Sequence, residues 1–461
     1  MAAKQIYLVT DLGGGDGGKG GVIHKLCHHK HAHTVVKVGG AQGSHGVRTG
    51  SGQAFNFSQF GCGTFEGVRT HISKLMVIEP YALMHEAQKL MYEWGIRDIY
   101  DYLTIDRDAL CITPFQTVAS QLMELARKDK PKGTVGIGTG VTIQDEENYP
   151  ELAIRAKDLA SPDLKDRLLV LQTIKMRELT PIIDHVQELW TDDQDQAREL
   201  IELLETPNLV DRIAESFAQL SKLAKIVDEQ FMVDNILSRN GTIVVEGSNG
   251  VLTDRYYGFH PHTSSLRTVP DQTIKILDGL HYDGEIKKIG VTRAYTIRHG
   301  AGTMVTESPL LLGELLPGSS KNDNRWQGKV RVGPLDLVAL RYAINACGGA
   351  QSFHALAITW LDQIMKAGSW SYCDSYNNAT DPDYFSATGE IIVSHGSGTE
   401  QYIRQERLGQ LLANCSPNLA RLDGTTVQLM KNCPNVIQEK LNVTVGLTTV
   451  GPTEQECFIK I

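Results

Sequence analysis

The sequence lacks any apolar stretch long enough to cross a membrane, and it lacks a hydrophobic leader. A membrane-spanning helix needs about 18 apolar residues in succession, and no segment reaches that length. The chain starts MAAKQIYLVTDL, whose apolar part is too short for a signal peptide, and a polar glycine-rich loop follows at once. We therefore expect a cytoplasmic protein with no membrane partner.

Runs of basic residues and closely paired cysteines are also missing. The formal net charge is −9, and no cluster of Lys and Arg forms an arm that could neutralise phosphates, so we expect no nucleic-acid partner. None of the eight cysteines forms a Cys-x-x-Cys pair, which is the spacing of many zinc and redox sites. We expect them to be reduced and mostly buried thiols, as in a cytosolic protein.

No Ser- or Pro-rich linker divides the chain, and no internal repeat is present. The 461 residues exceed what one hydrophobic core usually supports, yet without a visible boundary we favour a single domain over residues 1–461. From about 150 to 240 the chain is rich in Leu, Glu, Lys, Asp and Gln at helical spacing. We expect this region to be a mainly helical excursion from the domain.

Short β-branched segments punctuated by glycine define much of the remaining chain. Residues 6–12 predict a strand, 21–29 a helix and 34–40 a second strand, with a glycine-rich turn after the first strand. Further strands are expected at 242–247, 287–295, 355–361 and 444–450. The order of strand, turn, helix and strand at the start is typical of α/β proteins. The predicted fold is therefore α/β with a large mixed, mostly parallel sheet.

The turn after the first strand has the composition of a phosphate-binding loop. Residues 13–21 read GGGDGGKGG, and such glycines let backbone N–H groups approach an anion at the start of a helix. The spacing from Gly13 to Lys19 nearly matches the P-loop pattern GxxxxGK[ST], but Gly20 stands where the Mg²⁺-binding Ser or Thr belongs. Asp16 inside the loop is unusual, because a carboxylate repels an anion. A plain tight turn is the alternative, which seven glycines in nine residues disfavour.

This loop and the segment after it resemble the start of the adenylosuccinate synthetase family. That family carries Trp-Gly-Asp-Glu-Gly-Lys-Gly-Lys in its first loop and Gly-Gly-x-Asn-Ala-Gly-His-Thr in its second. The present chain has GGGDGGKGG at 13–21 and GGAQGSHGV at 39–47. The residues on matching positions are Asp16, Gly18, Lys19, Gly20 and His45.

Six further segments resemble motifs of the same family in the same order, so the resemblance spans almost the whole chain. They are GTVGIGTG at 133–140, VVEGSNGVLTDRYYGFHPHTSS at 244–265, TRAYTIRHGAG at 292–302, WQGKVRVGPLD at 326–336, AITWLD at 357–362 and TTVGPT at 448–453. One motif alone would be weak evidence of this resemblance, whereas eight motifs in the same order are specific to the family. The motifs RHGAG and WQGxxRxG are closer to those of the archaeal and phage-type branch of this family than to those of its common bacterial form.

The resemblance implies a ligase that joins L-aspartate to a purine nucleoside monophosphate, driven by GTP or ATP with Mg²⁺ as cofactor. It implies that Asp16 is the general base that takes the N1 proton and that His45 donates to the charge developing on O6. Lys19 would neutralise phosphoryl oxygens. Asp16 would also approach Mg²⁺, with Ser44 at the position of a second ligand, because this ion prefers oxygen ligands.

The resemblance also implies the binding residues. For the 5′-phosphate, purine, ribose and aspartate they are Thr134, Thr263, Asn249, Arg298 and Arg331, of which Arg331 would bind an aspartate carboxylate. For the nucleoside triphosphate they are Gly15, Gly18, Gly20, Asp362, Gly451 and Pro452. Members of the family form dimers, which implies a homodimer here.

Departures from the family pattern leave the substrates open. Gly17 replaces the Glu beside the base, and Trp360 replaces the Lys beside Asp362. Asp362 favours guanine, whereas a Trp can stack on any purine, so GTP and ATP both stay open. Asp16 favours IMP, because phage relatives that act on dGMP tend to carry a small residue there; dGMP is the alternative.

Two other functions compete with an active ligase. A non-catalytic nucleotide-binding relative could have lost Asp16 and His45, but the chain keeps both. A dinucleotide-binding oxidoreductase would need GxGxxG and an acidic residue at the end of the next strand, and that strand ends in KVGG here. The ligase is therefore preferred.

Overall fold

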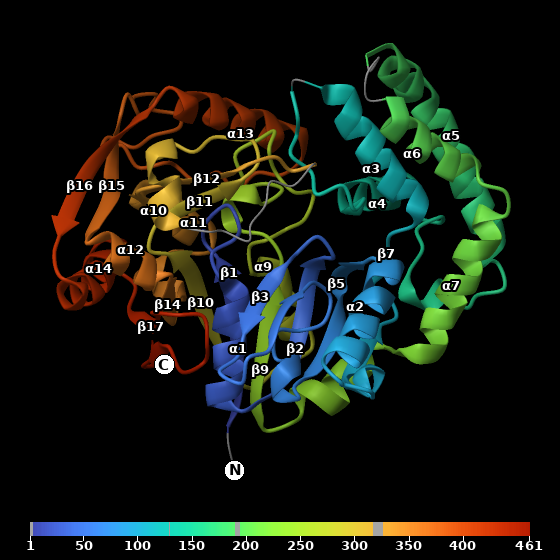
Figure 1. Cartoon of the computed structure of the whole chain (residues 1–461), viewed down its shortest axis with the longest axis horizontal. Helices are drawn as coiled ribbons and strands as arrows, with labels where there is room; N and C mark the ends of the chain where they lie inside the picture. Colours follow the sequence, from blue (N-terminus) through green and yellow to red (C-terminus); the bar gives the residue numbers. More distant parts are fainter. Residues whose placement is uncertain (1–2, 129, 190–193, 317–325) are drawn as a thin grey trace.

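Strand β1 (Lys4–Asp11) lies in the middle of a large sheet, and its last six residues are all buried (Figure 1). The computed structural model describes residues 3–128, 130–189, 194–316 and 326–461. Among these residues the sheet has eleven strands, in the order β18-β17-β14-β10-β1-β9-β2-β5-β6-β8, with β7 paired to β5. All neighbours pair in parallel except β17 and β18. The predicted α/β class with a mostly parallel sheet is confirmed.

The six strands predicted from the sequence all belong to this sheet, and each lies within two residues of its predicted ends. The other strands of the sheet are β2 (Ala32–Gly40), β5 (Arg69–Ile78), β6 (Leu103–Asp106), β7 (Leu110–Cys111), β8 (Lys225–Val227), β9 (Gly241–Gly247), β10 (Glu285–Arg293), β14 (Ala355–Thr359), β17 (Val445–Thr449) and β18 (Cys457–Ile459). Strands β5 to β8 and β18 had not been predicted. Strand β14 ends two residues early because Trp360 takes a left-handed conformation, with φ of 62°, and starts a helix.

Side chains that alternate along β1 face two different hydrophobic clusters. Tyr7 and Val9 join the larger cluster, which α1 (Lys19–Lys30) and α2 (Pro80–Glu93) cover. Ile6 and Leu8 join a smaller cluster on the opposite face, because successive side chains of a strand point to opposite sides. The elements on that face are α8 (Glu229–Met232), η4 (Val233–Leu237) and α9 (Asp271–Gly279).

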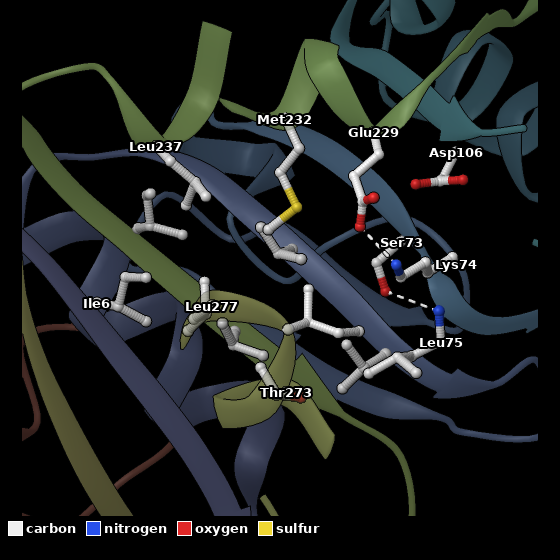
Figure 2. Close-up of a pocket in the computed structure, with 15 residues that line it drawn as sticks. Ile6, Ser73, Lys74, Leu75, Asp106, Glu229, Met232, Leu237, Thr273 and Leu277 are labelled. Atoms are coloured by element: carbon white, nitrogen blue, oxygen red, sulfur yellow. Dashed lines mark hydrogen bonds and ion pairs between the residues drawn. The ribbon is translucent and has the colours of Figure 1, made fainter. Parts of the chain in front are cut away.

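A narrow crevice runs between these last elements and the sheet (Figure 2). Its lining is mostly aliphatic and includes Ile6, Met232, Leu237 and Leu277. An ion pair between Lys74 and Glu229 lies at one side. The lining residues come from the strands and from α8, η4 and α9, and none comes from the loops after β1, β2 or β9, so the crevice is separate from the site described below.

Five helices form a layer beyond the β7 edge of the sheet (Figure 1). They are α3 (Pro114–Arg127), α4 (Thr139–Asn148), α5 (Leu164–Leu189), α6 (Gln194–Glu205) and α7 (Leu209–Leu223). Helices α5 to α7 lie inside the region that was expected to be helical, 150–240, and α3 packs against α5 and α6. The chain returns to the sheet at β8, before the expected end of the excursion. Within the described residues, no helix has the length and apolar character needed to cross a membrane.

The second half of the chain adds a smaller unit with its own hydrophobic cluster on the other side of the sheet. Its strands and helices are β11 (Thr296–His299), β12 (Val330–Gly333), β13 (Leu335–Asp336), β15 (Ser369–Asn377), β16 (Ser416–Asp423), α10 (Leu312–Leu315), α11 (Leu337–Ala346), α12 (Leu361–Ala367), α13 (Gly398–Ala413) and α14 (Thr426–Leu441). A separate hairpin joins β3 (His45–Arg48) to β4 (Ala54–Phe57). The remaining elements are single 3₁₀ turns: η1 (Thr64–Glu66), η2 (Ile99–Tyr102), η3 (Ala156–Asp158), η5 (Val251–Thr253), η6 (Pro309–Leu311) and η7 (Ala350–Ser352).

The carboxyl ends of the parallel strands all open onto one edge of the sheet. Strand β1 has β9 on one side and β10 on the other, so the loops after these three strands meet there. In open α/β sheets ligands bind at such an edge, where the strand order reverses. The candidate site lies at this edge.

The first turn of α1 lies directly against β3, which explains why Gly20 stands in place of a Ser or Thr. A Cβ on Gly20 would lie 2.7 Å from the Gly46 carbonyl oxygen and 2.8 Å from the His45 carbonyl carbon. A Cβ on the next residue, Gly21, would meet nothing closer than 3.7 Å. The glycine therefore keeps the helix and the hairpin in contact.

We expect Gly20→Ala to destabilise the protein, although Ala is ordinarily the better helix residue. Overpacking of this kind costs about 1–3 kcal/mol of unfolding free energy. The matched control, Gly21→Ala, should be neutral or stabilise by up to about 1 kcal/mol. Urea unfolding of both variants measures the difference; equal midpoints would contradict the close contact.

Candidate functional site

The loop after β1 folds around the carboxylate of Asp11. This side chain is fully buried and accepts hydrogen bonds from the backbone N–H groups of Gly13 (2.9 Å) and Gly17 (2.8 Å). The Lys19 ammonium group lies 3.1 Å from the same carboxylate and also donates to the Asn249 carbonyl at 2.6 Å. Lys19 thus ties the loop after β1 to the loop after β9.

Asn249 is held in a left-handed conformation, with φ of 61°, which Asn tolerates better than most residues. Its side-chain oxygen lies 3.5 Å from the amide nitrogen of Gln42, in the loop after β2. Gln42 in turn accepts a hydrogen bond from the hydroxyl of Thr139, at the start of α4. The loops after β1, β2 and β9 and the helical layer therefore meet at Asn249.

Asp16 projects from the top of the first loop and is partly exposed. Its backbone is also left-handed, with φ of 58°, and its carbonyl accepts a hydrogen bond from Arg293 Nε at 2.6 Å. One carboxylate oxygen lies 4.0 Å from His299 Nδ1. The other ring nitrogen of His299 donates to the Gly328 carbonyl at 3.0 Å. The predicted base is therefore fixed by its backbone and faces an imidazole.

His45 is buried on β3 and is oriented by Glu246. Its Nδ1 lies 2.6 Å from the Glu246 carboxylate, which also receives Lys37 Nζ at 2.7 Å and the Cys62 backbone N–H at 2.9 Å. Burial would raise the pKa of Glu246, but Lys37 and His45 lower it below its usual value. Burial lowers the pKa of His45, and the bond to Glu246 opposes this.

The bond to Glu246 also fixes the tautomer of His45. An ionised carboxylate can only accept, so Nδ1 carries the hydrogen and Nε2 is an acceptor in the neutral ring. A Cβ added to Gly43 would lie 3.7 Å from this Nε2 and 3.2 Å from Ser248 Cβ. Nε2 therefore faces the loops after β2 and β9, and donation from it requires a second proton on the ring.

Two groups in this region could be considered for a metal ion. The ligand atoms of His45, Cys62 and Glu246 lie within 4.8 Å of one another. Imidazole and thiol suit softer metals, and the Lys37 ammonium already contacts the same carboxylate oxygen, so this group does not fit Mg²⁺. The partly exposed carboxylate of Asp16 and the exposed residue Ser44 offer the oxygen atoms that Mg²⁺ prefers.

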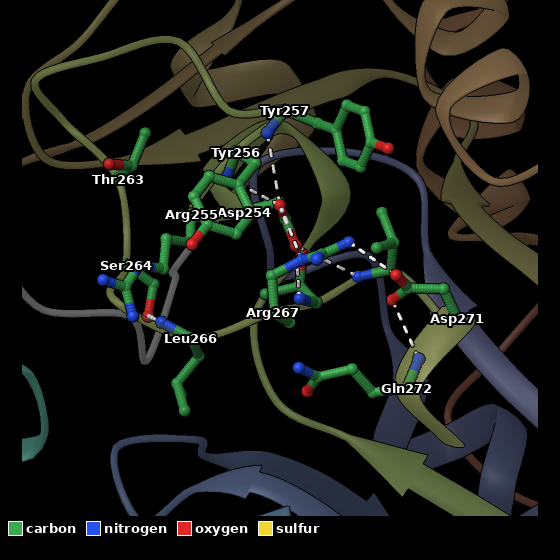
Figure 3. Close-up of polar contacts among 12 residues, drawn as sticks. Asp254, Arg255, Tyr256, Tyr257, Thr263, Ser264, Leu266, Arg267, Asp271 and Gln272 are labelled. Carbon is green, nitrogen blue, oxygen red and sulfur yellow. Dashed lines mark hydrogen bonds and ion pairs between the residues drawn. The ribbon is translucent and has the colours of Figure 1, made fainter. Parts of the chain in front are cut away.

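A buried carboxylate also organises the loop that carries Thr263 (Figure 3). Asp254 accepts hydrogen bonds from the backbone N–H groups of Tyr256 (2.8 Å) and Val269 (3.2 Å), and Arg267 Nε lies 3.4 Å away. These contacts fold residues 254–269 back on themselves. Thr263 lies on the outer part of this loop, away from Asp254.

Arg298 is almost fully buried and joins three of the predicted segments. Its guanidinium donates to the carbonyls of His262 and Ala301, both at 2.9 Å. A Cβ on Gly14 would lie 3.6 Å from its Nη1, so the group also borders the first loop. Burial and the neighbouring Arg331 lower the pKa of Arg298 to about 10.

Arg331 lies opposite Arg298 on the paired strands β11 and β12. Its guanidinium donates to the carbonyls of Gly300 (2.9 Å) and Gly302 (2.7 Å) and pairs with Glu307 at 2.7 Å. Thr134 lies in a neighbouring loop and accepts a hydrogen bond from the Gly136 N–H. The pairing of Arg331 with Arg298 across the two strands and its engagement with the turn at 300–302 were not predicted from the sequence.

Three of the residues predicted for the triphosphate, Asp362, Gly451 and Pro452, follow the ends of β14 and β17. The Trp360 backbone N–H donates to the Thr449 hydroxyl at 3.2 Å, and the Arg293 guanidinium lies 4.2 Å from the centre of the Trp360 ring. The Asp362 carboxylate accepts from Gln363 Nε2 (2.6 Å) and Lys366 Nζ (3.2 Å).

Gly18 and Gly451 lie at points of close approach, whereas a Cβ on Gly15 would meet nothing within 4 Å. A Cβ on Gly18 would lie 3.0 Å from the Thr359 hydroxyl, and a Cβ on Gly451 would lie 2.3 Å from the Glu456 carboxyl. The Pro452 carbonyl accepts from Lys25 Nζ of α1 at 3.1 Å, and Gly15 has φ of 104°. The last loop therefore packs on the same helix as the first.

Three residues of this edge had escaped sequence reasoning, namely Asp11, Glu246 and Arg293. Each lies at or near the carboxyl end of a buried strand, which is the signal that could have found them. Of the predicted residues, Lys19 and Gly20 begin α1, His45 begins β3, Arg298 and Arg331 lie on β11 and β12, and Asp362 lies in α12.

Comparison with known proteins gives one family. The model of the adenylosuccinate synthetase family matches residues 9–458. Adenylosuccinate synthetase of Chlorobium chlorochromatii is 29% identical over 369 residues, which are 78% of this chain and 77% of that protein. The enzyme of Dehalococcoides mccartyi is 26% identical over 455 residues, 97% of each chain.

Solved structures show the same fold. Fully ligated adenylosuccinate synthetase from Plasmodium falciparum superposes with a TM-score of 0.73 at 18% identity, covering 99% of both chains. Succinoaminodeoxyadenylate synthetase of cyanophage S-2L, bound to dGMP and dATP, superposes with a TM-score of 0.59 at 13% identity, covering 99% of this chain and 96% of that one. The predicted family resemblance is confirmed.

We expect Glu246→Gln to lower the free energy of unfolding by about 3 kcal/mol at pH 7, because it leaves the buried Lys37 ammonium without its carboxylate. The lowered pKa of Glu246 means that its charge stabilises the fold above its ordinary pKa of 4.5 and that this stabilisation is lost as the pH falls below that value. The gap between the two proteins should therefore narrow below about pH 4.5. Urea unfolding at several pH values measures both effects.

The matched control is Glu229→Gln, which removes the carboxylate of the partly exposed pair with Lys74. Such exposed pairs contribute about 0–1 kcal/mol. If Glu246→Gln cost no more than this control, the buried pair would not hold the site together.

Proposed function

Since the chain belongs to the adenylosuccinate synthetase family, whose members are ligases that form a C–N bond, we propose that it joins L-aspartate to C6 of IMP at the expense of GTP or ATP. The observation that carries this proposal is the convergence of Asp16, Lys19, His45 and Asn249 at the edge where the sheet reverses its strand order.

In the proposed reaction Asp16 takes the proton from N1 of the purine as O6 attacks the γ-phosphorus, and the nucleoside diphosphate leaves. The amine of aspartate then attacks C6, loses a proton, and phosphate departs with O6. The ammonium of Lys19 balances the charge of the transferred phosphoryl group. His45 is placed by Glu246 to hydrogen-bond O6, and it donates when both ring nitrogens carry protons.

We propose Mg²⁺ as the cofactor, held by Asp16 and the backbone of Ser44. Bound there, the ion would neutralise charge on the phosphates. The oxygen donors available at these two residues support this placement, whereas the buried imidazole and thiol of the neighbouring group do not.

Aspartate is proposed to bind beside the guanidinium pair of Arg298 and Arg331. A dicarboxylate suits two adjacent cations, and the burial of Arg298 strengthens its field. The Arg331 guanidinium already pairs with Glu307, so an incoming carboxylate would exchange with that side chain. Thr134, Thr263 and their loops border the same region and would hold the 5′-phosphate.

IMP is favoured over dGMP by the carboxylate of Asp16, which would crowd the 2-amino group of a guanine base. The cyanophage enzyme that was solved with dGMP shares the fold, so dGMP is the second candidate substrate.

We also propose a cytoplasmic homodimer. All eight cysteines are free thiols, as a reducing compartment would keep them.

Purified protein with Mg²⁺ and L-aspartate should form a succinyl nucleotide from IMP, and less readily from dIMP, GMP or dGMP, when assayed with ATP or GTP. Asp16→Asn should keep the fold and reduce turnover at least ~10²-fold, the usual contribution of a general base. Asp283→Asn removes an exposed carboxylate far from the site and should change nothing. Near-normal turnover of Asp16→Asn would remove this residue from the mechanism, and a preference for dGMP would reverse the substrate assignment.

We expect ATP and GTP to support the reaction within about tenfold of each other, a difference of ~1.4 kcal/mol. Asp362, which would read guanine, already accepts from Gln363 and Lys366, and Trp360 offers a ring face that does not distinguish purines. Lys366→Met should release the carboxylate and raise the preference for GTP. Competition at equal concentrations measures the ratio. A preference for GTP above about a hundredfold, or ~2.7 kcal/mol, would refute relaxed selectivity.

A further inference from the structure

Asp11 is a carboxylate at the base of a loop that is expected to bind phosphate, where a negative charge needs an explanation. Its carboxylate contacts two backbone N–H groups and the ammonium group of Lys19. We propose that Asp11 is a positioning residue for the triphosphate, acting through Lys19. The inference rests on the proposed function only in taking a nucleoside triphosphate as the ligand of this loop.

The position of Asp11 is fixed by the sheet. It is the last residue of the central strand, paired with Val291 of β10, and the next N–H of the chain, that of Leu12, donates to the Val291 carbonyl at 2.9 Å. Residues 13–18, by contrast, are all glycine except for Asp16 and have few side chains to pack. The Asp11 carboxylate therefore provides the rigid point to which the loop is attached.

Lys19 needs such a point because its side chain is long and flexible. Fixing a lysine side chain costs rotamer entropy, which otherwise opposes phosphate binding. Here the ammonium is already fixed by two acceptors, Asp11 at 3.1 Å and the Asn249 carbonyl at 2.6 Å. An ammonium group has three hydrogens, so one donor direction is left for a phosphate oxygen.

Gly17 makes this arrangement possible. A Cβ at this position would lie 2.7 Å from Asp11 Oδ2 and 2.9 Å from its Cγ, so a side chain at 17 and the carboxylate at 11 exclude each other. The resemblance places a Glu at position 17. In this chain the carboxylate beside Lys19 comes from the strand instead, and Gly17 leaves the room for it.

A double-mutant cycle separates this role from a purely structural one. The variants are Asp11→Asn, Lys19→Met and the double variant, and the readout is the dissociation constant of a non-hydrolysable ATP or GTP analogue with Mg²⁺, measured by calorimetry. We expect Asp11→Asn to weaken binding about tenfold or more, as for a lost hydrogen bond to a charged group. Added to Lys19→Met, it should weaken binding less than about twofold, because the residue it acts through is gone. The proposal would be overturned if the two substitutions raised the dissociation constant by factors that multiply in the double variant. It would also be overturned if Asp11→Asn left binding unchanged.

A second pair of variants covers the case that Asp11→Asn does not fold. Gly17→Ala presses a methyl group on the carboxylate, whereas Gly279→Ala, on α9 and outside the loops of the site, meets nothing within 4 Å. We expect Gly17→Ala to weaken analogue binding and Gly279→Ala to leave it within about twofold; equal effects would count against the proposal. These measurements need no product, so a failure to form any succinyl nucleotide would refute the proposed reaction and leave the Asp11 result standing.

Discussion

The cross-strand pair of Lys37 and Glu246 is the interaction on which the site depends. The two residues are register partners on β2 and β9, and both side chains are buried. A carboxylate placed there is tolerated only because donors surround it. The donors are Lys37, the ring of His45 and the backbone of Cys62, so one buried charge holds the end of the sheet, the β3 hairpin and the loop before η1 in fixed relation.

A second carboxylate repeats this arrangement one strand away. Asp11 on β1 fixes Lys19 and the first loop, as Glu246 on β9 fixes Lys37 and His45. At this edge of the sheet each buried carboxylate is paired with a lysine, so the two negative and two positive charges nearly cancel. The surplus positive groups, Arg293 and Arg298, lie on the far side of the first loop.

Much of the fold could be predicted because its central strands are continuous β-branched runs. Strands β1, β2, β9, β10, β14 and β17 are of this kind. Strand β16, by contrast, alternates exposed and half-buried residues and reads SPNLARLD, so its polar sequence gave no signal. Helix α3 did offer one, since Thr113 and Gln116 form a capping box before Pro114, and it was missed.

The site could be predicted where the chemistry lies in a local motif, as for Asp16, Lys19 and Asn249. It could not be predicted where a role depends on a distant partner. Glu246 lies 201 residues from His45, and nothing in its own neighbourhood indicates that it orients an imidazole. Likewise, the carbonyl groups of Gly300 and Gly302, which accept hydrogen bonds from Arg331, could be identified only from the folded turn beside it.

The spread of the site along the chain has a consequence for how the protein is made. The first loop leaves the ribosome before its neighbours, which come from β9, β10, β14 and the loop after β17. Lys25 of α1 has its acceptor in Pro452, 427 residues further along the chain. Contacts so distant in sequence form slowly. The loops of this edge therefore reach their final arrangement only after the segment that follows β17 has been made.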